Sequence, residues 1–105
     1  MNTLTINFRQ KRDRIEIMTT RQLTIQNELG IHARVVSRIV NEARKFASTI
    51  IVRKADRSFD LKKMLGVIEI GGRYGDVLQL EFDGADEEAA ALAFEALFLN
   101  KFGEK

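Results

Sequence analysis

A strand pattern meets a helix pattern in Asn27-Glu-Leu-Gly-Ile-His-Ala-Arg-Val-Val-Ser-Arg-Ile-Val40, and the rest of the chain is organised around this stretch. On its N-terminal side, residues 20–26 alternate polar and apolar side chains, which predicts a half-buried strand. Toward its C-terminal side, apolar residues recur at helical spacing, which predicts a helix over residues 32 to about 46. Gly30 supplies the backbone freedom that a sharp turn between the two elements requires.

The only histidine of the chain, His32, falls at this junction. The start of a helix offers unpaired N–H groups and the positive end of the helix dipole, and both favour anions such as phosphate. A neutral imidazole nitrogen is a nucleophile near neutral pH, and Arg34 adds a charge-assisted donor for phosphate oxygens. A lone histidine in such a place most often only flanks its helix. Two interpretations therefore stay open: a polar residue at a helix end, or a nucleophile that accepts a phosphoryl group.

The composition indicates one small globular domain. The chain has 105 residues, of which 45% are hydrophobic and 30% charged, and its formal net charge is only +2. It lacks cysteine, which excludes disulfides and thiolate metal sites, so we expect a reducing cytoplasm, no metal and no cofactor. No apolar run approaches the roughly 20 residues that span a membrane, and the N-terminus lacks the pattern of a signal peptide. The modest charge argues against nucleic acid as the partner.

Residues 1–18 are predicted to be an N-terminal extension of a domain over residues 19–105. Their apolar residues alternate on either side of a basic run, Arg9–Arg14. This pattern fits an extra hairpin around a charged turn, a disordered basic arm, or a segment upstream of a natural start at Met18. We favour a poorly ordered or loosely attached segment, because a lone hairpin is only marginally stable in water.

Three more strands are predicted, at residues 48–53, 58–61 and 77–82. Residues 62–70 fit a short helix, although their length suits neither a helix nor a strand well. A final helix is predicted to start at Asp86, a good N-cap, and to end near Lys101. Its buried stripe is Ala90, Phe94, Leu97 and Phe98. The order β-α-β-β-(α)-β-α indicates an α+β fold with one largely antiparallel sheet and helices on a single face.

Three segments of the chain are distinctive: Gly30-Ile-His-Ala-Arg34, Lys62-Lys-Met-Leu-Gly-Val-Ile-Glu-Ile-Gly71 and Gly84-Ala-Asp-Glu-Glu88. They look like the active-site motif, the short second helix and the entry to the last helix of one family. That family is the histidine-containing phosphocarrier protein (HPr) family of bacterial phosphotransferase systems. Each segment alone is a weak signal, but their order and spacing are specific. The resemblance covers about residues 19–102.

The resemblance implies an open-faced β-sandwich, in which four antiparallel strands carry three helices on one side. It implies that His32 accepts a phosphoryl group on Nδ1 from enzyme I, which phosphoenolpyruvate has phosphorylated. His32 would then pass the group to a histidine of an enzyme IIA domain. Arg34 would contact the phosphoryl oxygens. Transfer between imidazoles needs mainly positioning and charge stabilisation, so we add the backbone N–H groups of Ala33 and Arg34 as phosphate donors. We expect a monomeric relay component rather than a stand-alone enzyme.

Two positions depart from the family pattern. Val35 stands where the family usually has proline directly after the arginine, so the loop loses stiffness but regains an N–H donor. Lys63 stands where Gram-positive members carry a serine that a dedicated kinase phosphorylates, so we expect that control to be absent. Asn27–Gly30 and Leu97–Gly103 look more like the nitrogen-related branch, which phosphorylates regulatory enzyme IIA proteins, than like the sugar-uptake branch.

Further family positions predict a docking surface for partners. It would consist of apolar residues, Met64, Leu65 and Ile68, and of a basic rim, Arg38, Lys62 and Lys63. Methionine suits such a surface because it adapts to different shapes, and the basic rim would steer acidic partners. The alternative is that the apolar residues belong to the core and that the charges are ordinary solvated ones.

Two other functions stay open at this point. The first is a regulatory binding module on the same fold, which would associate with partners without carrying phosphate. The second, which we rank lower, is a nucleic-acid-binding domain that uses the basic extension and therefore binds in a salt-dependent way. The presence of both His32 and Arg34 favours the phosphocarrier over the pure binding module.

Overall fold

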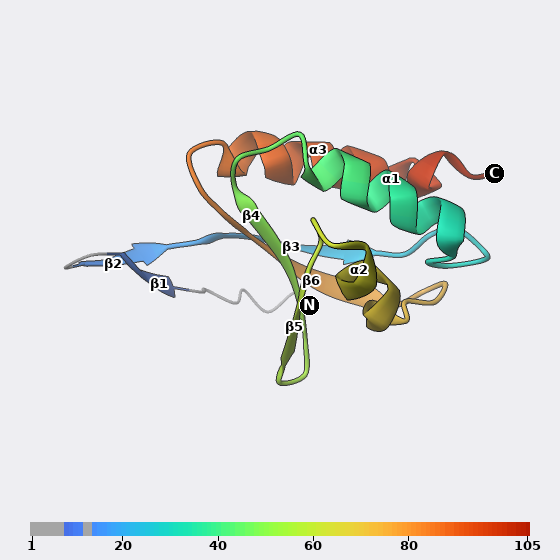
Figure 1. Cartoon of the computed structure of the whole chain (residues 1–105), viewed down its shortest axis with the longest axis horizontal. Coiled ribbons are helices and arrows are strands. Elements are labelled where there is room, and N and C mark those ends of the chain that lie inside the picture. The colour runs from blue at the N-terminus through green and yellow to red at the C-terminus, as the bar shows by residue number, and fades with distance from the viewer. Residues whose placement is uncertain (1–7, 12–13) are drawn as a thin grey trace, which may run out of the picture.

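Four antiparallel strands form the sheet of this α+β fold. The computed structural model describes residues 8–11 and 14–105, and the order of the sheet is β3-β6-β4-β5. The strands are β3 Thr19–Thr24, β4 Thr49–Lys54, β5 Arg57–Asp60 and β6 Val77–Asp83. The helices are α1 Ala33–Ala43, α2 Met64–Ile70 and α3 Glu87–Leu99, followed by a 3₁₀ turn, η1 Lys101–Gly103. Figure 1 shows the helices on one side of the sheet and the C-terminus close to the start of α1.

The sheet has one covered face and one open face, because side chains alternate along each strand. Leu78, Leu80 and Phe82 of β6 are all buried beneath the helices. In the pairing of β4 with β6, Ile50 lies opposite Phe82 and Val52 lies opposite Leu80, so these side chains share the covered face. The intervening residues of each strand point to the other side, and the fold is therefore an open-faced sandwich.

Helices α1 and α3 cover the buried face of the sheet. The buried residues of α1 are those at helical spacing: Val35, Val36, Ile39, Val40 and Ala43. On α3, Phe94 is fully buried, and its ring packs against that of Phe82 with 6.0 Å between the ring centroids. Such an aromatic pair adds about 0.5–1.5 kcal/mol to the burial of the two rings. This core holds α1, which begins directly after the histidine, against the sheet.

The predicted fold class is confirmed, and the predicted ends of most elements differ from the observed ends by a few residues. The ambiguous residues 62–70 contain the short helix α2. Helix α3 ends at Leu99 rather than near Lys101. The physical reason is that Lys101 and Phe102 adopt the left-handed conformation, with φ of 58° and 56°, which cannot continue a right-handed helix.

The start of α3 is tied to the loop before β4. Asp86 lies at the N-cap of α3, as its sequence context predicts, but its side chain does not cap the helix. Its carboxylate instead accepts hydrogen bonds from the N–H groups of Ala47 and Ser48, both at 2.9 Å. The hydroxyl of Ser48, followed by these N–H groups, lowers the pKa of Asp86 below its ordinary value of 3.8. One carboxylate thus links two distant parts of the chain.

Two further strands, β1 Phe8–Lys11 and β2 Arg14–Ile17, pair antiparallel as a separate two-stranded sheet. Figure 1 shows this pair extending away from the main sheet. The pairing corresponds to the hairpin alternative for the extension, whose residues 1–7 and 12–13 lie outside the described part of the chain. The division between extension and domain stays a prediction. Among the described residues, no helix has both the length and the apolar character needed to cross a membrane.

Candidate functional site

The loop before α1 is a tight turn that packs against the segment after α2. Gly30 adopts a φ of +67°, and its carbonyl accepts a hydrogen bond from the side-chain amide of Asn27 at 2.7 Å. The N–H of Ile31 donates to the carbonyl of Gly72 at 3.0 Å. A Cβ atom at position 30 would lie 2.7 Å from that same carbonyl oxygen, so glycine is required there on both grounds. The loop therefore presents the next residue, His32, in a fixed position.

His32 is the N-cap of α1, with extended backbone (φ −109°, ψ 178°). Its carbonyl accepts the first helical hydrogen bond, from the N–H of Val36 at 2.9 Å, but its ring does not cap the helix. The N–H groups of Ala33, Arg34 and Val35 consequently have no acceptor within α1. Together with the positive end of the helix dipole, they form a site suited to an anion. The predicted backbone donors, Ala33 and Arg34, belong to this set.

A carboxylate from the C-terminal end of the chain completes the site. Oε1 of Glu104 lies 2.5 Å from Nε2 of His32, and Oε2 lies 3.4 Å from Nη1 of Arg34. Nη1 of Arg38 approaches the same Oε2 at 3.8 Å. The hydrogen bond with His32, helped by the charges of the two arginines, lowers the pKa of Glu104 below its ordinary value of 4.5. Glu104 is therefore ionised at neutral pH.

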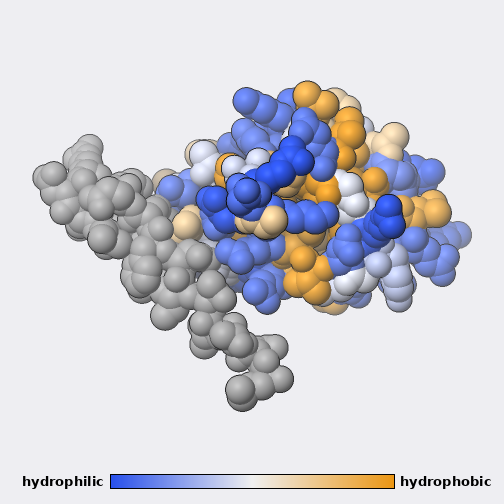
Figure 2. All heavy atoms as spheres, turned by 90° about the horizontal axis from the view of Figure 1, so that it is seen from below, coloured by the Kyte–Doolittle hydropathy of each residue, from blue (hydrophilic) through white to orange (hydrophobic). Residues whose placement is uncertain are grey.

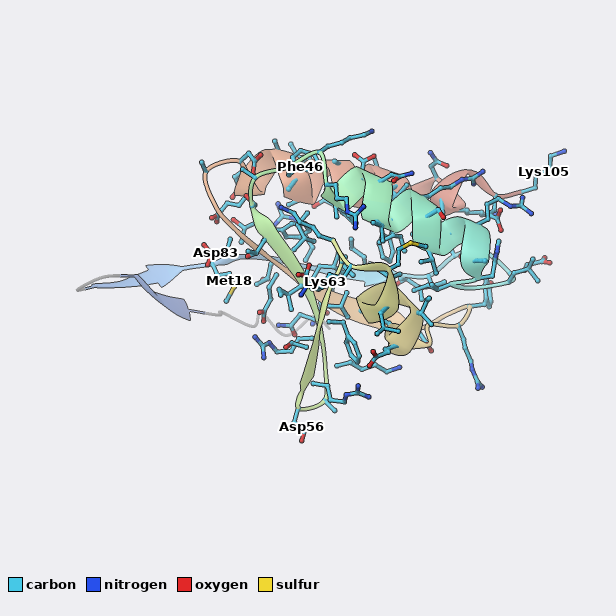
Figure 3. The ribbon with its side chains drawn as sticks, viewed as in Figure 1. Met18, Phe46, Asp56, Lys63, Asp83 and Lys105 are labelled. Carbon is cyan, nitrogen blue, oxygen red and sulfur yellow. The ribbon has the colours of Figure 1, made fainter. Side chains whose placement is uncertain are left out.

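Glu104 is the site residue that the sequence patterns do not reveal. It lies 72 residues from His32 along the chain. The one available signal is the tail Phe102-Gly-Glu104, which follows directly on the pattern of the last helix. That signal identifies a site residue only once the end of α3 is known to lie near the start of α1. Figure 3 shows this arrangement, with Lys105 at the end of the molecule where α1 begins.

The three apolar residues of the predicted docking surface are exposed on α2. The exposed fractions are 50% for Met64, 67% for Leu65 and 55% for Ile68. The core face of the same helix is formed by Val67 and Ile70. Figure 2 shows apolar surface among hydrophilic side chains on the side of the molecule where α2 lies in Figure 1. The alternative that these three residues fill the core is therefore wrong.

The three basic residues of the predicted rim are placed differently from one another. Lys63 is the exposed N-cap of α2, and Figure 3 shows it at the start of that helix. Lys62 donates from its ammonium group to the carbonyl of Phe46 at 2.7 Å, which fastens the loop after α1. Arg38 donates to the carbonyl of Phe102 in η1. Lys62 and Arg38 thus have structural partners, whereas Lys63 presents its charge to solvent.

Comparison with known proteins identifies the family. The family model described as the PTS HPr component phosphorylation site matches residues 19–100. The chain belongs to the HPr family. The phosphocarrier protein HPr of Cupriavidus necator is 38% identical over 87 residues, which cover 83% of this chain and 98% of that protein. The HPr of Lysinibacillus sphaericus is 42% identical over 80 residues, which cover 76% of this chain and 88% of that protein.

Solved structures of HPr proteins agree with the fold. The crystal structure of HPr-C-His from Thermoanaerobacter tengcongensis aligns with a TM-score of 0.79 at 36% identity, and the alignment covers 84% of this chain and 99% of that one. The predicted family and the predicted HPr-like architecture are therefore confirmed. Membership makes the chain a phosphocarrier-family protein of the phosphotransferase system, and positions 32 and 34 lie within the matched residues 19–100.

Proposed function

We propose that this HPr-family chain accepts a phosphoryl group on Nδ1 of His32 from phosphorylated enzyme I and passes it to a histidine of an enzyme IIA domain. One observation carries the proposal. The imidazole of His32 stands at the N-cap of α1, beside N–H groups without helical acceptors and within the same small cluster as the guanidinium of Arg34. A nucleophile and an anion site thus occupy one place.

The groups around His32 supply what phosphoryl transfer requires. The transferred group carries negative charge on its oxygens in the transition state, so catalysis consists mainly of positioning and of charge stabilisation. The N–H groups of Ala33 and Arg34 and the helix dipole provide fixed donors. The side chain of Arg34 is 67% exposed, so it can turn from Glu104 toward the oxygens of an incoming phosphoryl group.

The exposed surface of α2 supplies a place for partners to dock. Met64, Leu65 and Ile68 form an apolar surface, with Lys63 at its edge, on a helix that packs against α1. An apolar centre with a charged rim is the usual composition of a protein–protein interface. We propose that enzyme I and enzyme IIA bind here in turn, because a relay must present the same histidine to donor and acceptor.

Mass spectrometry tests the proposed function. After incubation with enzyme I and phosphoenolpyruvate, we expect the protein to gain one phosphoryl group that is labile in acid and stable in base. His32→Ala should gain none. Equal labelling of His32→Ala would show that another residue is the acceptor. Association with enzyme I or enzyme IIA, but no label on the wild-type protein, would identify a regulatory binding module instead.

A further inference from the structure

The contact between His32 and Glu104 gives the two ring nitrogens different roles. The carboxylate oxygen lies 2.5 Å from Nε2. An ionised carboxylate can only accept a hydrogen bond, so Nε2 must carry the proton of the neutral ring. Nδ1 is then left with its lone pair, and it is the nitrogen that can attack phosphorus. The identity of the nucleophilic atom thus depends on a residue outside the motif that contains the histidine.

The carboxylate reaches the ring through a turn with an uncommon backbone. Lys101, Phe102 and Gly103 have φ angles of 58°, 56° and 78° in succession. The left-handed region is unfavourable for most residues other than glycine, lysine and phenylalanine among them, because the Cβ atom crowds the following carbonyl. Two such non-glycine residues in a row persist only where the surrounding structure holds them, and this kind of strain is concentrated at functional sites.

Three contacts hold this turn in place. Phe102 is fully buried, and its ring meets that of Phe98 edge-on at 4.8 Å between centroids. Arg38 donates from Nη1 to the carbonyl of Phe102. The N–H of Gly103 donates to the side-chain oxygen of Asn100 at 2.9 Å. The turn is therefore a packed part of the fold, and the carboxylate that follows it has a fixed position.

We infer that Glu104 is a positioning residue for phosphoryl transfer: its carboxylate keeps the proton on Nε2 and leaves Nδ1 as the acceptor atom. This inference rests on the proposed function and deepens it. During transfer, the lone pair of Nδ1 forms the new N–P bond. The bond between phosphorus and the donor's imidazole nitrogen breaks, and that nitrogen keeps the electron pair. Because the proton stays on Nε2, the ring of His32 gains positive charge, which Glu104 faces and stabilises.

The single histidine allows a direct test in the unphosphorylated protein. ¹⁵N NMR of the neutral imidazole gives the ratio of the Nε2–H to the Nδ1–H tautomer without any partner protein. We expect this ratio to be about tenfold higher in the wild type than in Glu104→Ala, which is the effect of one charge-assisted hydrogen bond. The matched control is Glu28→Ala, which removes an exposed carboxylate from the loop before His32 and should keep the wild-type ratio.

Phosphoramidate, a small phosphoryl donor, tests the consequence for the acceptor atom. ³¹P NMR should show the Nδ1 isomer of phosphohistidine in the wild type and in Glu28→Ala, and a several-fold larger share of the Nε2 isomer in Glu104→Ala. An unchanged tautomer ratio or an unchanged isomer share in Glu104→Ala overturns the inference, whether or not enzyme I labels the protein. If both shift as expected but enzyme I fails to label the wild type, the role of Glu104 is supported and the proposed function is refuted.

Discussion

The guanidinium of Arg34 is a positive charge that can change its partner. Its side chain is largely exposed, and it lies 3.4 Å from the carboxylate of Glu104, which a phosphoryl group can replace. In the proposed transfer, Arg34→Ala would delete a charge-assisted hydrogen bond to the phosphoryl oxygens, and such a bond is worth about 1.5–3 kcal/mol. We therefore expect the rate of phosphoryl acceptance from enzyme I to fall about tenfold to a hundredfold. Rapid-quench measurement of label incorporation gives this rate.

Arg34→Lys is the matched variant for this prediction. Lysine keeps the charge but loses the planar fork that binds two oxygens at once, so its rate should lie between those of the wild type and Arg34→Ala. Wild-type rates in both variants would show that the N–H groups at the start of α1 stabilise the transition state without help from this side chain.

Single residues are predictable from the sequence where a local motif contains them. His32 and Arg34 lie two positions apart, and the change from strand to helix spacing around them is visible in the sequence. Glu104 reaches the same ring because Phe102 packs against Phe98 and turns the chain after α3. Periodicity does not encode that turn, since its backbone is left-handed at residues that ordinarily avoid this conformation.

At the scale of the elements, the hydrogen bonds to Asp86 that join the start of α3 to the loop before β4 should make the stability of the fold depend on pH in the acid range. The pKa of Asp86 is lowered in the folded protein, chiefly by the Ser48 hydroxyl and then by the N–H of Ala47. A carboxyl group with a lowered pKa stabilises the fold at pH values above its ordinary pKa of 3.8. That contribution is lost as the pH falls through the lower pKa that the group has in the folded protein. We expect Asp86→Asn to have a lower melting temperature than the wild type near pH 7, and the difference to shrink in acid below the folded pKa.

Asp56→Asn is the control for this prediction, because Figure 3 shows Asp56 at the tip of the exposed β4–β5 turn. Its melting temperature should follow that of the wild type at both pH values. Calorimetry of the three proteins at neutral and acid pH measures the comparison. A deficit for Asp86→Asn that has the same size at both pH values would contradict the electrostatic explanation.

Elements are predictable where one periodicity dominates, and α2 shows where this fails. Its seven residues make about two turns, which is too short to show a clear helical period. The helix approaches β5 so closely that a Cβ atom at Gly66 would lie 2.6 Å from the carbonyl oxygen of Asp60. An ion pair between Arg57 and Glu69, at 3.1 Å, also joins the two elements. These tertiary contacts, rather than local sequence, distinguish the helix from a strand.

For the whole molecule, alternation predicts an antiparallel sheet with one covered face but not the order of its strands. In the order β3-β6-β4-β5, the last strand in sequence lies between earlier ones. Leu80 of β6 consequently pairs with Arg21 on one side and with Val52 on the other. Pairings over such sequence distances are set by packing, which a single sequence does not display. The order of the elements already predicted helices on a single face, and the family resemblance added the architecture of four strands with three helices.

The stability of the whole molecule should not depend on the N-terminal extension. The β1–β2 pair forms a sheet of its own, and among residues 18–105, whose side-chain burial the structure describes, the buried apolar residues lie between Ile25 and Phe102. We expect a variant that starts at Met18 to melt within about 2 °C of the full chain, since a loss of about 1 kcal/mol would lower the melting temperature by about 4–8 °C. It should also accept a phosphoryl group from enzyme I at the same rate.

A melting temperature lower by several degrees would show that the extension belongs to the folded domain. Slower labelling at an unchanged melting temperature would show that the extension contacts enzyme I.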